Sequence, residues 1–193
     1  MSAAAEKPDW DQLFEVAAAQ SGYFSTQQAA SAGYSNQLLL KHIRAGRMFR
    51  TRRGVYRLVH FPAGEHEDLV VAWLWSDRAG VMSHETALLL HGLSDVLPDI
   101  VHLTLPPAWS RRRIQVPNGI EVRFAEVAAE DRSWFGPVPI TTPRRTLIDC
   151  AKGALSPDLL RQAAAGALRR GLVERAGISE VAEALAPYGG LPA

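Results

Sequence analysis

The 193-residue chain has a single cysteine, Cys150, so it cannot form an intrachain disulfide. It has no apolar run that approaches the ~18 residues of a membrane-spanning helix. Its first residues show no basic segment followed by an apolar one, which is the pattern of a secretory signal peptide. We therefore expect a cytoplasmic protein with no membrane partner. Cys150 lies in an apolar-periodic run, where a buried structural thiol is expected rather than a nucleophile.

Motifs that would indicate catalysis are also missing. The sequence has no Gly-rich phosphate loop and no nucleophile elbow. A metal nuclease would be expected to carry Glu-x-Lys on a strand, but Glu121-Val122-Arg123 and Glu126-Val127-Ala128 lack the lysine. His84 and His91 are seven residues apart, about 10 Å along a helix, which is too far for one metal ion. We therefore predict neither enzyme activity nor a metal or other cofactor.

The chain has a formal net charge of only +1, but its basic side chains are concentrated in one segment. Residues 1–60 hold eight Lys and Arg against four Asp and Glu, and residues 36–57 hold seven basic side chains and no acidic one. These seven are Lys41, Arg44, Arg47, Arg50, Arg52, Arg53 and Arg57. A local basic patch on a nearly neutral chain is the electrostatic pattern of a nucleic-acid-binding site.

Three short helices are predicted over residues 9–21, 26–32 and 36–45. Ser25 and Gln28 have the spacing of a capping box at the start of the second helix, and Phe24 is placed to act as its hydrophobic staple. Ser35 is the expected N-cap of the third helix. The short turn between the second and third helices is typical of a helix-turn-helix. The small and polar residues 1–8 are expected to be disordered.

A basic hairpin is predicted directly after the third helix. Residues 48–51 and 55–58 alternate apolar and basic side chains around Arg52-Arg53-Gly54, where the glycine can adopt a positive φ. A helix-turn-helix followed by such a hairpin is a winged helix. We place this winged helix-turn-helix domain at residues 9–61, with a linker marked by Pro62 and Gly64.

The third helix and the hairpin supply the candidate DNA-binding residues. In a winged helix the third helix enters the major groove, and the hairpin lies on the backbone or in the adjacent minor groove. Asn36, Gln37 and Lys41 are expected near bases, because Asn and Gln can pair with adenine and Lys with guanine. Phosphate contacts, which fix affinity and register, are expected from Arg44, Arg50, Arg52 and Arg53. The complete set of candidates is Asn36, Gln37, Lys41, Arg44, Arg47, Arg50, Arg52 and Arg53. The alternative is an ordinary solvated basic face.

Residues 65–186 are predicted to form a mixed α+β domain with a small antiparallel sheet, which makes the fold class of the chain α+β. Helices are expected over residues 65–79, 83–93, 143–152 and 156–170 and from Ser179, a strand over residues 100–105, and a hairpin joining residues 113–116 to 120–127 through an Asn-Gly turn. Arg111–Arg113 are expected in a solvated loop rather than at a second DNA contact. Arg144 and Arg145 open a helix, where cations oppose the dipole, so an ion pair with Asp149 or another carboxylate is expected.

Taken in order, these motifs resemble AbiEi-type antitoxins over about residues 10–170. The N-terminal motifs are Phe24–Ala29, Gly33–Ser35, Ile43–Arg47 and Arg53–Arg57, and those of the second domain are Ser83–Ala87, Leu90–Leu93, Val101–Thr104 and Thr141–Asp149. The resemblance implies a transcriptional autorepressor that binds the double-stranded DNA of its own promoter. It also implies an antitoxin that counteracts a nucleotidyltransferase-like toxin, without requiring a stable complex, and it implies no cofactor.

Two other functions remain open from the sequence. One is a plain winged-helix transcription factor without a toxin partner, and the other is a divergent metal-dependent nuclease. The third helix also carries Leu38 and Leu40 at outer or flanking positions that are often polar in such domains. These leucines could contact thymine methyl groups, or they could pack on the second domain and partly mask the DNA-binding face.

Overall fold

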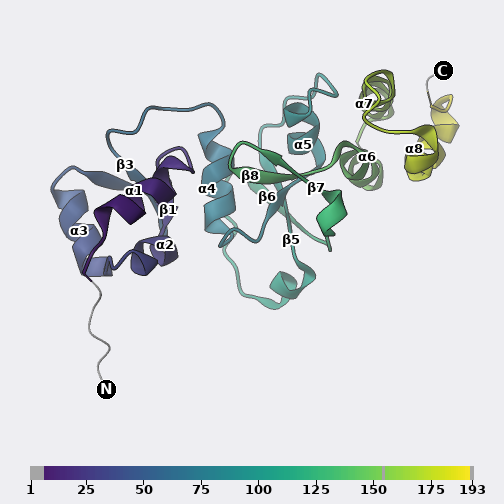
Figure 1. Ribbon diagram of the computed structural model, residues 1–193. Coiled ribbons are helices and arrows are strands. Elements are labelled where there is room, and N and C mark those ends of the chain that lie inside the picture. The colour runs from purple at the N-terminus through teal and green to yellow at the C-terminus, as the bar shows by residue number, and fades with distance from the viewer. Residues whose placement is uncertain (1–6, 154, 192–193) are drawn as a thin grey trace. The chain divides into compact units, whose positions relative to one another are not determined.

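The computed structural model describes residues 7–153 and 155–191 of the chain (Figure 1). The chain divides into two compact units, Met1–Arg78 and Ala79–Ala193. Both units combine helices with a sheet, so the predicted α+β class is confirmed. The expected disorder of residues 1–8 falls mainly outside the described residues. Among those that are described, no helix is long and apolar enough to cross a membrane.

The N-terminal unit contains four helices and a three-stranded antiparallel sheet of order β1-β3-β2 among its described residues. The helices are α1 (Trp10–Ala18), α2 (Thr26–Ser31), α3 (Asn36–Arg44) and α4 (Glu67–Trp75), and the strands are β1 (Tyr23–Ser25), β2 (Met48–Arg52) and β3 (Val55–Leu58). The predicted start signals are confirmed. Ser25 and Gln28 form a capping box at α2, and the Ser35 hydroxyl accepts a hydrogen bond from the Leu38 backbone N–H at α3.

The predicted hairpin is confirmed as β2 and β3, but the sequence reading missed β1. Tyr23 and Phe24 of β1 pair with Arg57 and Tyr56 of β3, so β3 is the central strand. A strand of three residues is too short to show the alternation that marks a half-buried strand. The helices α1, α2 and α3 pack with the sheet around one hydrophobic core. Its buried members include Leu13, Phe24, Tyr34, Leu39, Met48, Tyr56 and Leu58.

The helix α4 belongs to the N-terminal unit, and an ion pair between buried Arg57 and half-buried Glu67 joins it to the sheet. Arg57 on β3 is buried between the rings of Tyr23 and Phe49, with its guanidinium carbon 5.3 Å and 5.9 Å from the two ring centres. Its Nη2 donates to Glu67 Oε1 at 2.8 Å, and the Tyr23 hydroxyl donates to Glu67 Oε2 at 2.8 Å. The predicted linker near Pro62–Gly64 therefore lies within this unit, which continues to Arg78.

The C-terminal unit contains a five-stranded mixed sheet of order β6-β5-β4-β8-β7. The strands are β4 (Val81–Met82), β5 (Val101–Leu105), β6 (Ile120–Phe124), β7 (Arg132–Phe135) and β8 (Val138–Thr141). The helices are α5 (His84–Leu90), α6 (Pro143–Lys152), α7 (Pro157–Arg169) and α8 (Ser179–Leu185). Helices α5 to α8 share a core with buried members Leu88, Leu147, Ile148, Leu160, Ile178 and Leu185. Cys150 is fully buried in that core, and burial raises the pKa of its thiol, as expected for a structural cysteine.

The predicted second hairpin is wrong, and the sheet is mixed rather than antiparallel. β6 runs parallel to β5, with Val101 opposite Ile120 and Leu105 opposite Phe124. A parallel pair needs a crossover of a dozen or more residues, and residues 106–119 provide it. The Asn-Gly turn does form, since Gly119 has φ +81°, but it leads the crossover into β6 instead of joining two antiparallel strands.

The Arg57–Glu67 ion pair is expected to stabilise the N-terminal unit. Replacing Glu67 with Ala leaves the buried guanidinium without its carboxylate, with the Pro62 carbonyl as a remaining acceptor. Loss of these charged hydrogen bonds should destabilise the unit by about 2 kcal/mol. Burial alone would raise the pKa of Glu67, but hydrogen bonds from the Gly64 N–H, Tyr23 and Arg57 outweigh it and lower that pKa. Its stabilisation is therefore complete above the unfolded-state pKa of about 4.3 and is lost as the pH falls through the lower folded-state value.

Hydrogen exchange of β3 peptides, followed against denaturant at pH 7 and pH 3, measures both effects. Glu65→Ala is the matched control, because Glu65 is exposed two residues away. Equal protection of β3 in wild type and Glu67→Ala at pH 7 would contradict the assigned role of the pair.

Candidate nucleic-acid interface

Helix α3 has one buried side and one exposed side. Leu39 and His42 are buried, and Leu38 and Ile43 pack partly against the core of the unit. These four residues form the inner face of α3. The opposite side is exposed and consists of Asn36, Gln37, Leu40, Lys41 and Arg44, which we call the outer face of α3. These positions lie on one side because residues three and four apart are neighbours on a helix.

The buried His42 side chain packs α3 against two aromatic rings. Its ring stacks on Trp10 of α1 at 6.0 Å and meets the edge of Tyr34 at 5.4 Å. Burial, followed by the charges of Arg47 and Lys41, lowers the pKa of His42, so the imidazole is neutral at neutral pH. His42 therefore supports the packing of α3 and adds no charge to the basic surface.

The hairpin is tied to the helix-turn-helix at its tip. Gly54 occupies the turn with φ +80°, a conformation that costs a residue with a side chain about 1 kcal/mol or more. The Gly54 carbonyl accepts hydrogen bonds from the Thr26 N–H at 2.9 Å and the Thr26 hydroxyl at 3.3 Å. Since Thr26 is the first residue of α2, the hairpin tip and the helix-turn-helix are held together. The sequence gives no local signal for this contact, because the two residues are far apart in the chain.

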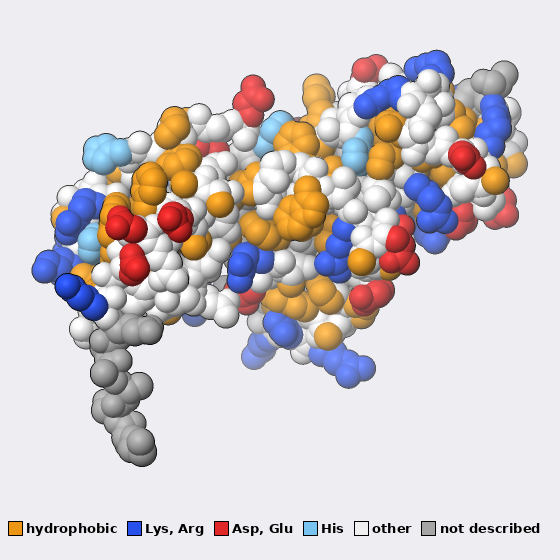
Figure 2. All heavy atoms as spheres, in the orientation of Figure 1, with side chains coloured by type: hydrophobic (Ala, Val, Ile, Leu, Met, Phe, Trp, Pro, Cys, Tyr) orange, Lys and Arg blue, Asp and Glu red, His pale blue; other side chains and the backbone are white. Residues whose placement is uncertain are grey.

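The structure leaves the predicted DNA-binding residues accessible and removes Arg57 from the basic surface. Arg57 is buried and paired with Glu67, so it neutralises a carboxylate rather than facing solvent. Of the eight candidate residues, Arg52 is half-buried and the others are exposed. Among the described residues, no carboxylate pairs with Lys41, Arg44, Arg47 or Arg53. Figure 2 shows Lys and Arg side chains gathered over the end of the N-terminal unit that carries α3 in Figure 1.

The C-terminal unit offers a polar cluster around the motif residues at the start of α5. The Ser83 hydroxyl lies 2.7 Å from that of Thr104 and 2.9 Å from His84 Nδ1, and Thr86 Oγ1 accepts from the His102 N–H at 2.8 Å. Burial first, then Arg123 and His102, lowers the pKa of His84 to about 3. Because Ser83 is fully buried, these hydroxyls join β4, β5 and α5 and are not placed to meet a substrate.

Other sequence-predicted positions of this unit have local partners. His91 Nε2 donates to the Thr141 carbonyl at 2.7 Å. The expected Arg145–Asp149 pair is present at 2.8 Å, and Asp131 also pairs with Arg145, at 3.3 Å. Within the described ranges no group of three or more His, Cys, Asp or Glu could hold a metal ion.

The arginine triplet Arg111–Arg113 is exposed, as expected, and the Arg112 guanidinium stacks on the Trp109 ring at 4.2 Å.

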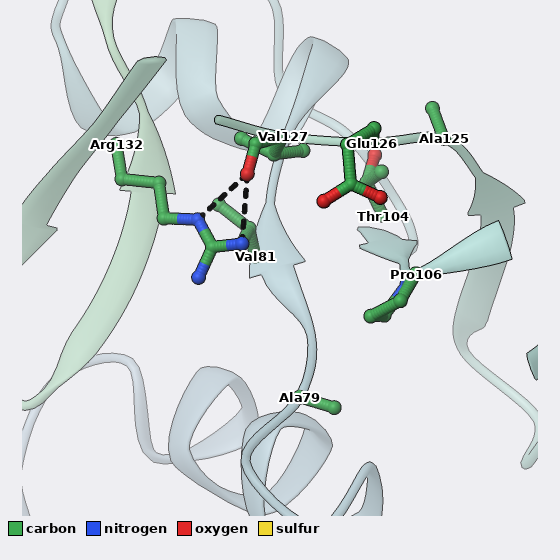
Figure 3. A pocket seen from close by; sticks show the side chains of 8 residues that line it. All are labelled: Ala79, Val81, Thr104, Pro106, Ala125, Glu126, Val127 and Arg132. Carbon is green, nitrogen blue, oxygen red and sulfur yellow. Dashed lines mark hydrogen bonds between the residues drawn. The ribbon is translucent and has the colours of Figure 1, made fainter. Parts of the chain in front are cut away.

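A small hollow lies in the C-terminal unit. Figure 3 shows that it is lined by Ala79, Val81, Thr104, Pro106, Ala125, Glu126, Val127 and Arg132. In this hollow the Arg132 guanidinium donates two hydrogen bonds to the Val127 carbonyl, from Nε at 3.0 Å and from Nη2 at 2.7 Å. A volume of about 10 Å³ has room for one water molecule, so the hollow does not compete with the basic surface as a binding site.

Comparison with known proteins gives a match on the helix-turn-helix and the hairpin. Residues 11–59 match the family described as "Transcriptional regulator, AbiEi antitoxin". The resemblance to AbiEi-type antitoxins is thus confirmed over this segment, and the family that it matches is described as one of transcriptional regulators. No curated protein matches the chain. Among solved structures, the chain is similar to the RV2827C protein from Mycobacterium tuberculosis. The identity is 14%, coverage is 93% of this chain and 77% of that chain, and the TM-score is 0.47.

The position of His42 predicts a pH dependence for the N-terminal unit. Because the folded-state pKa of His42 is below its unfolded value of 6.5, the unfolded chain binds the proton more readily. The stability of the unit should therefore fall as the pH drops from 7 through 6.5 toward the folded-state pKa. Denaturant midpoints between pH 7.5 and 5 measure the slope, and His42→Leu should flatten it. His60→Leu, at an exposed histidine, should leave it as in wild type, and an unchanged slope in His42→Leu would contradict this assignment.

Proposed function

We propose that the chain is a sequence-specific DNA-binding transcriptional regulator that reads the major groove with α3. The observation that carries this proposal is the outer face of α3, which presents two amides and two cations next to an accessible basic hairpin. No acidic residue occurs between Glu15 and Glu65, so nothing in that stretch repels a phosphate backbone. The family matched by residues 11–59 supports the same function.

The residues divide between reading bases and holding the backbone. Asn36 and Gln37 begin α3, and amide side chains can donate to and accept from adenine in the major groove. Lys41 lies one turn further on and would accompany them at a guanine or a phosphate. The remaining candidates would neutralise phosphates, which positions the protein without reading sequence: Arg44, Arg47, Arg50, Arg52 and Arg53.

We further propose that the chain represses its own promoter and acts as the antitoxin of a nucleotidyltransferase-like toxin. The motif resemblance over residues 10–170 and the family description support this proposal. The C-terminal unit lies outside the matched segment and is the candidate for the antitoxin activity. It holds twelve basic and twelve acidic residues, a balance suited to a protein partner or an indirect effect rather than to a polyanion.

The second candidate function is a plain winged-helix transcription factor. It is favoured by the end of the family match at residue 59, which leaves the C-terminal unit free for ligand binding or self-association. The third reading, a divergent nuclease, has less support. Glu121 pairs with Arg123 at 2.7 Å, and Ser83 is buried.

The hairpin provides a first test of DNA binding. Replacing Arg50 and Arg53 with Ala should weaken binding to all sequences. It should also reduce the slope of log affinity against log salt by about 0.9 for each lost phosphate contact. Binding to the upstream DNA of the gene, measured from low to moderate salt, gives the slope. Arg169→Ala, at an exposed arginine on α7, is the matched control. An unchanged slope in the double variant would remove the hairpin from the interface.

Co-expression tests the antitoxin proposal separately. The full chain should restore growth to cells expressing a nucleotidyltransferase-like protein encoded beside it. The Arg50→Ala, Arg53→Ala double variant should restore growth as well, because the antitoxin activity is assigned to the C-terminal unit. Growth is scored with both proteins under unrelated promoters, so that repression cannot lower the amount of toxin. Continued arrest with the intact chain would favour the plain transcription factor.

A further inference from the structure

One large apolar side chain stands on the outer face of α3. Leu40 is 53% exposed, whereas its neighbour Leu38 packs against the core of its own unit. From the sequence, either leucine could contact a thymine methyl group or pack on the second domain. In the structure Leu38 is partly buried and Leu40 is exposed. Single exposed leucines are ordinary on protein surfaces, so exposure alone does not indicate a function for Leu40. Its position among the proposed DNA-binding residues does.

Leu40 lies among the residues proposed to meet DNA. It follows Asn36 by one turn, precedes Arg44 by one turn, and is adjacent in sequence to Lys41. Leucine side chains on helices lean toward the helix N-terminus. The Leu40 side chain therefore covers the turn that carries Asn36 and Gln37, the two amides at the start of the helix.

The major groove offers one apolar group to such a side chain. It is the C5 methyl of thymine, the largest apolar group on the base edges there, whereas the groups that distinguish the other bases are hydrogen-bond donors and acceptors. A leucine placed in the groove opposite any other base would lose water from its own surface and from a polar edge without a compensating bond. Contact with a methyl group instead buries apolar surface on both partners.

We propose that Leu40 is a specificity-determining residue that recognises a thymine methyl group in the DNA site. This inference rests on the proposed function of α3. The recognised thymine lies within one or two base pairs of the base contacted by Asn36 or Gln37, because the leucine covers that turn. The site therefore contains a thymine beside an amide-read base pair, and the preference is for the methyl group rather than for the hydrogen-bonding edge.

Deoxyuridine isolates the methyl group, because it pairs like thymine but lacks that carbon. The full-length wild-type chain first enriches a duplex from a random DNA pool, and each thymine of the enriched motif is then replaced in turn by deoxyuridine. At one position the replacement should weaken wild-type binding about fourfold, the effect of losing about one buried methyl group. Leu40→Ala should bind the thymine duplex more weakly and bind both duplexes equally.

Three variants give the comparison its controls. Leu40→Met retains an apolar side chain and should keep the discrimination between thymine and deoxyuridine. Leu97→Ala removes a leucine that is 80% exposed in the C-terminal unit and should behave as wild type. Comparing two proteins on two duplexes cancels any effect of deoxyuridine on DNA shape, because only the coupling between side chain and methyl group remains.

The outcomes separate this inference from the function on which it rests. Equal discrimination by wild type and Leu40→Ala would overturn the role of Leu40 while leaving DNA reading by α3 intact. A motif without a thymine at which deoxyuridine matters would overturn it in the same way. Failure of the wild-type chain to enrich any motif would overturn the proposed function itself.

Discussion

The N-terminal unit depends on the neutralisation of one buried guanidinium. Arg57 lies on the central strand β3 between two aromatic rings, and its carboxylate partner Glu67 belongs to the first turn of α4. A buried charge that loses its carboxylate partner is destabilising, so the arginine on this strand favours the conformation in which α4 is packed against the sheet. A single set of contacts thus joins β1, β3 and α4. It explains why the compact unit continues to Arg78 rather than ending after the hairpin.

The elements that the sequence predicted well are those with signals written in consecutive residues. Ser25 with Gln28 and Ser35 mark helix starts that the structure contains. The missed strands β1, β4, β7 and β8 are two to four residues long, too short for a clear alternation of apolar and polar residues. β1, β4 and β8 also pair with strands that are distant in the chain. The Asn-Gly turn was recognised, but a turn signal does not say whether the following strand runs parallel or antiparallel to its neighbour.

The sequence allowed the residue types of the candidate site to be predicted. It was a poorer guide to which of the neighbouring side chains are buried. Lys41 and Arg44 follow the helical spacing that also buries Leu39, so their exposure followed from the pattern. Arg57 has the same charge and was counted with them, but the alternation of the hairpin does not reveal that α4 covers its side of the sheet. The opposite behaviour of Leu38 and Leu40 was also beyond the sequence, because both lie at the edge of the apolar stripe and only the packed core decides between them.

The two hydrogen bonds between Thr26 and Gly54 have a consequence for the thermodynamics of association. They connect the first turn of α2 to the tip of the hairpin, and α3, the element proposed for the groove, packs into the same core as α2 and the hairpin. The element proposed for the groove and the element proposed for the backbone therefore belong to one packed unit. A protein whose contact elements are already fixed relative to one another loses less conformational entropy on binding than one that must order them. In the proposed complex, the spacing between groove and backbone contacts is therefore set before DNA binds, and a duplex whose groove width departs from that spacing would have to deform to fit the protein.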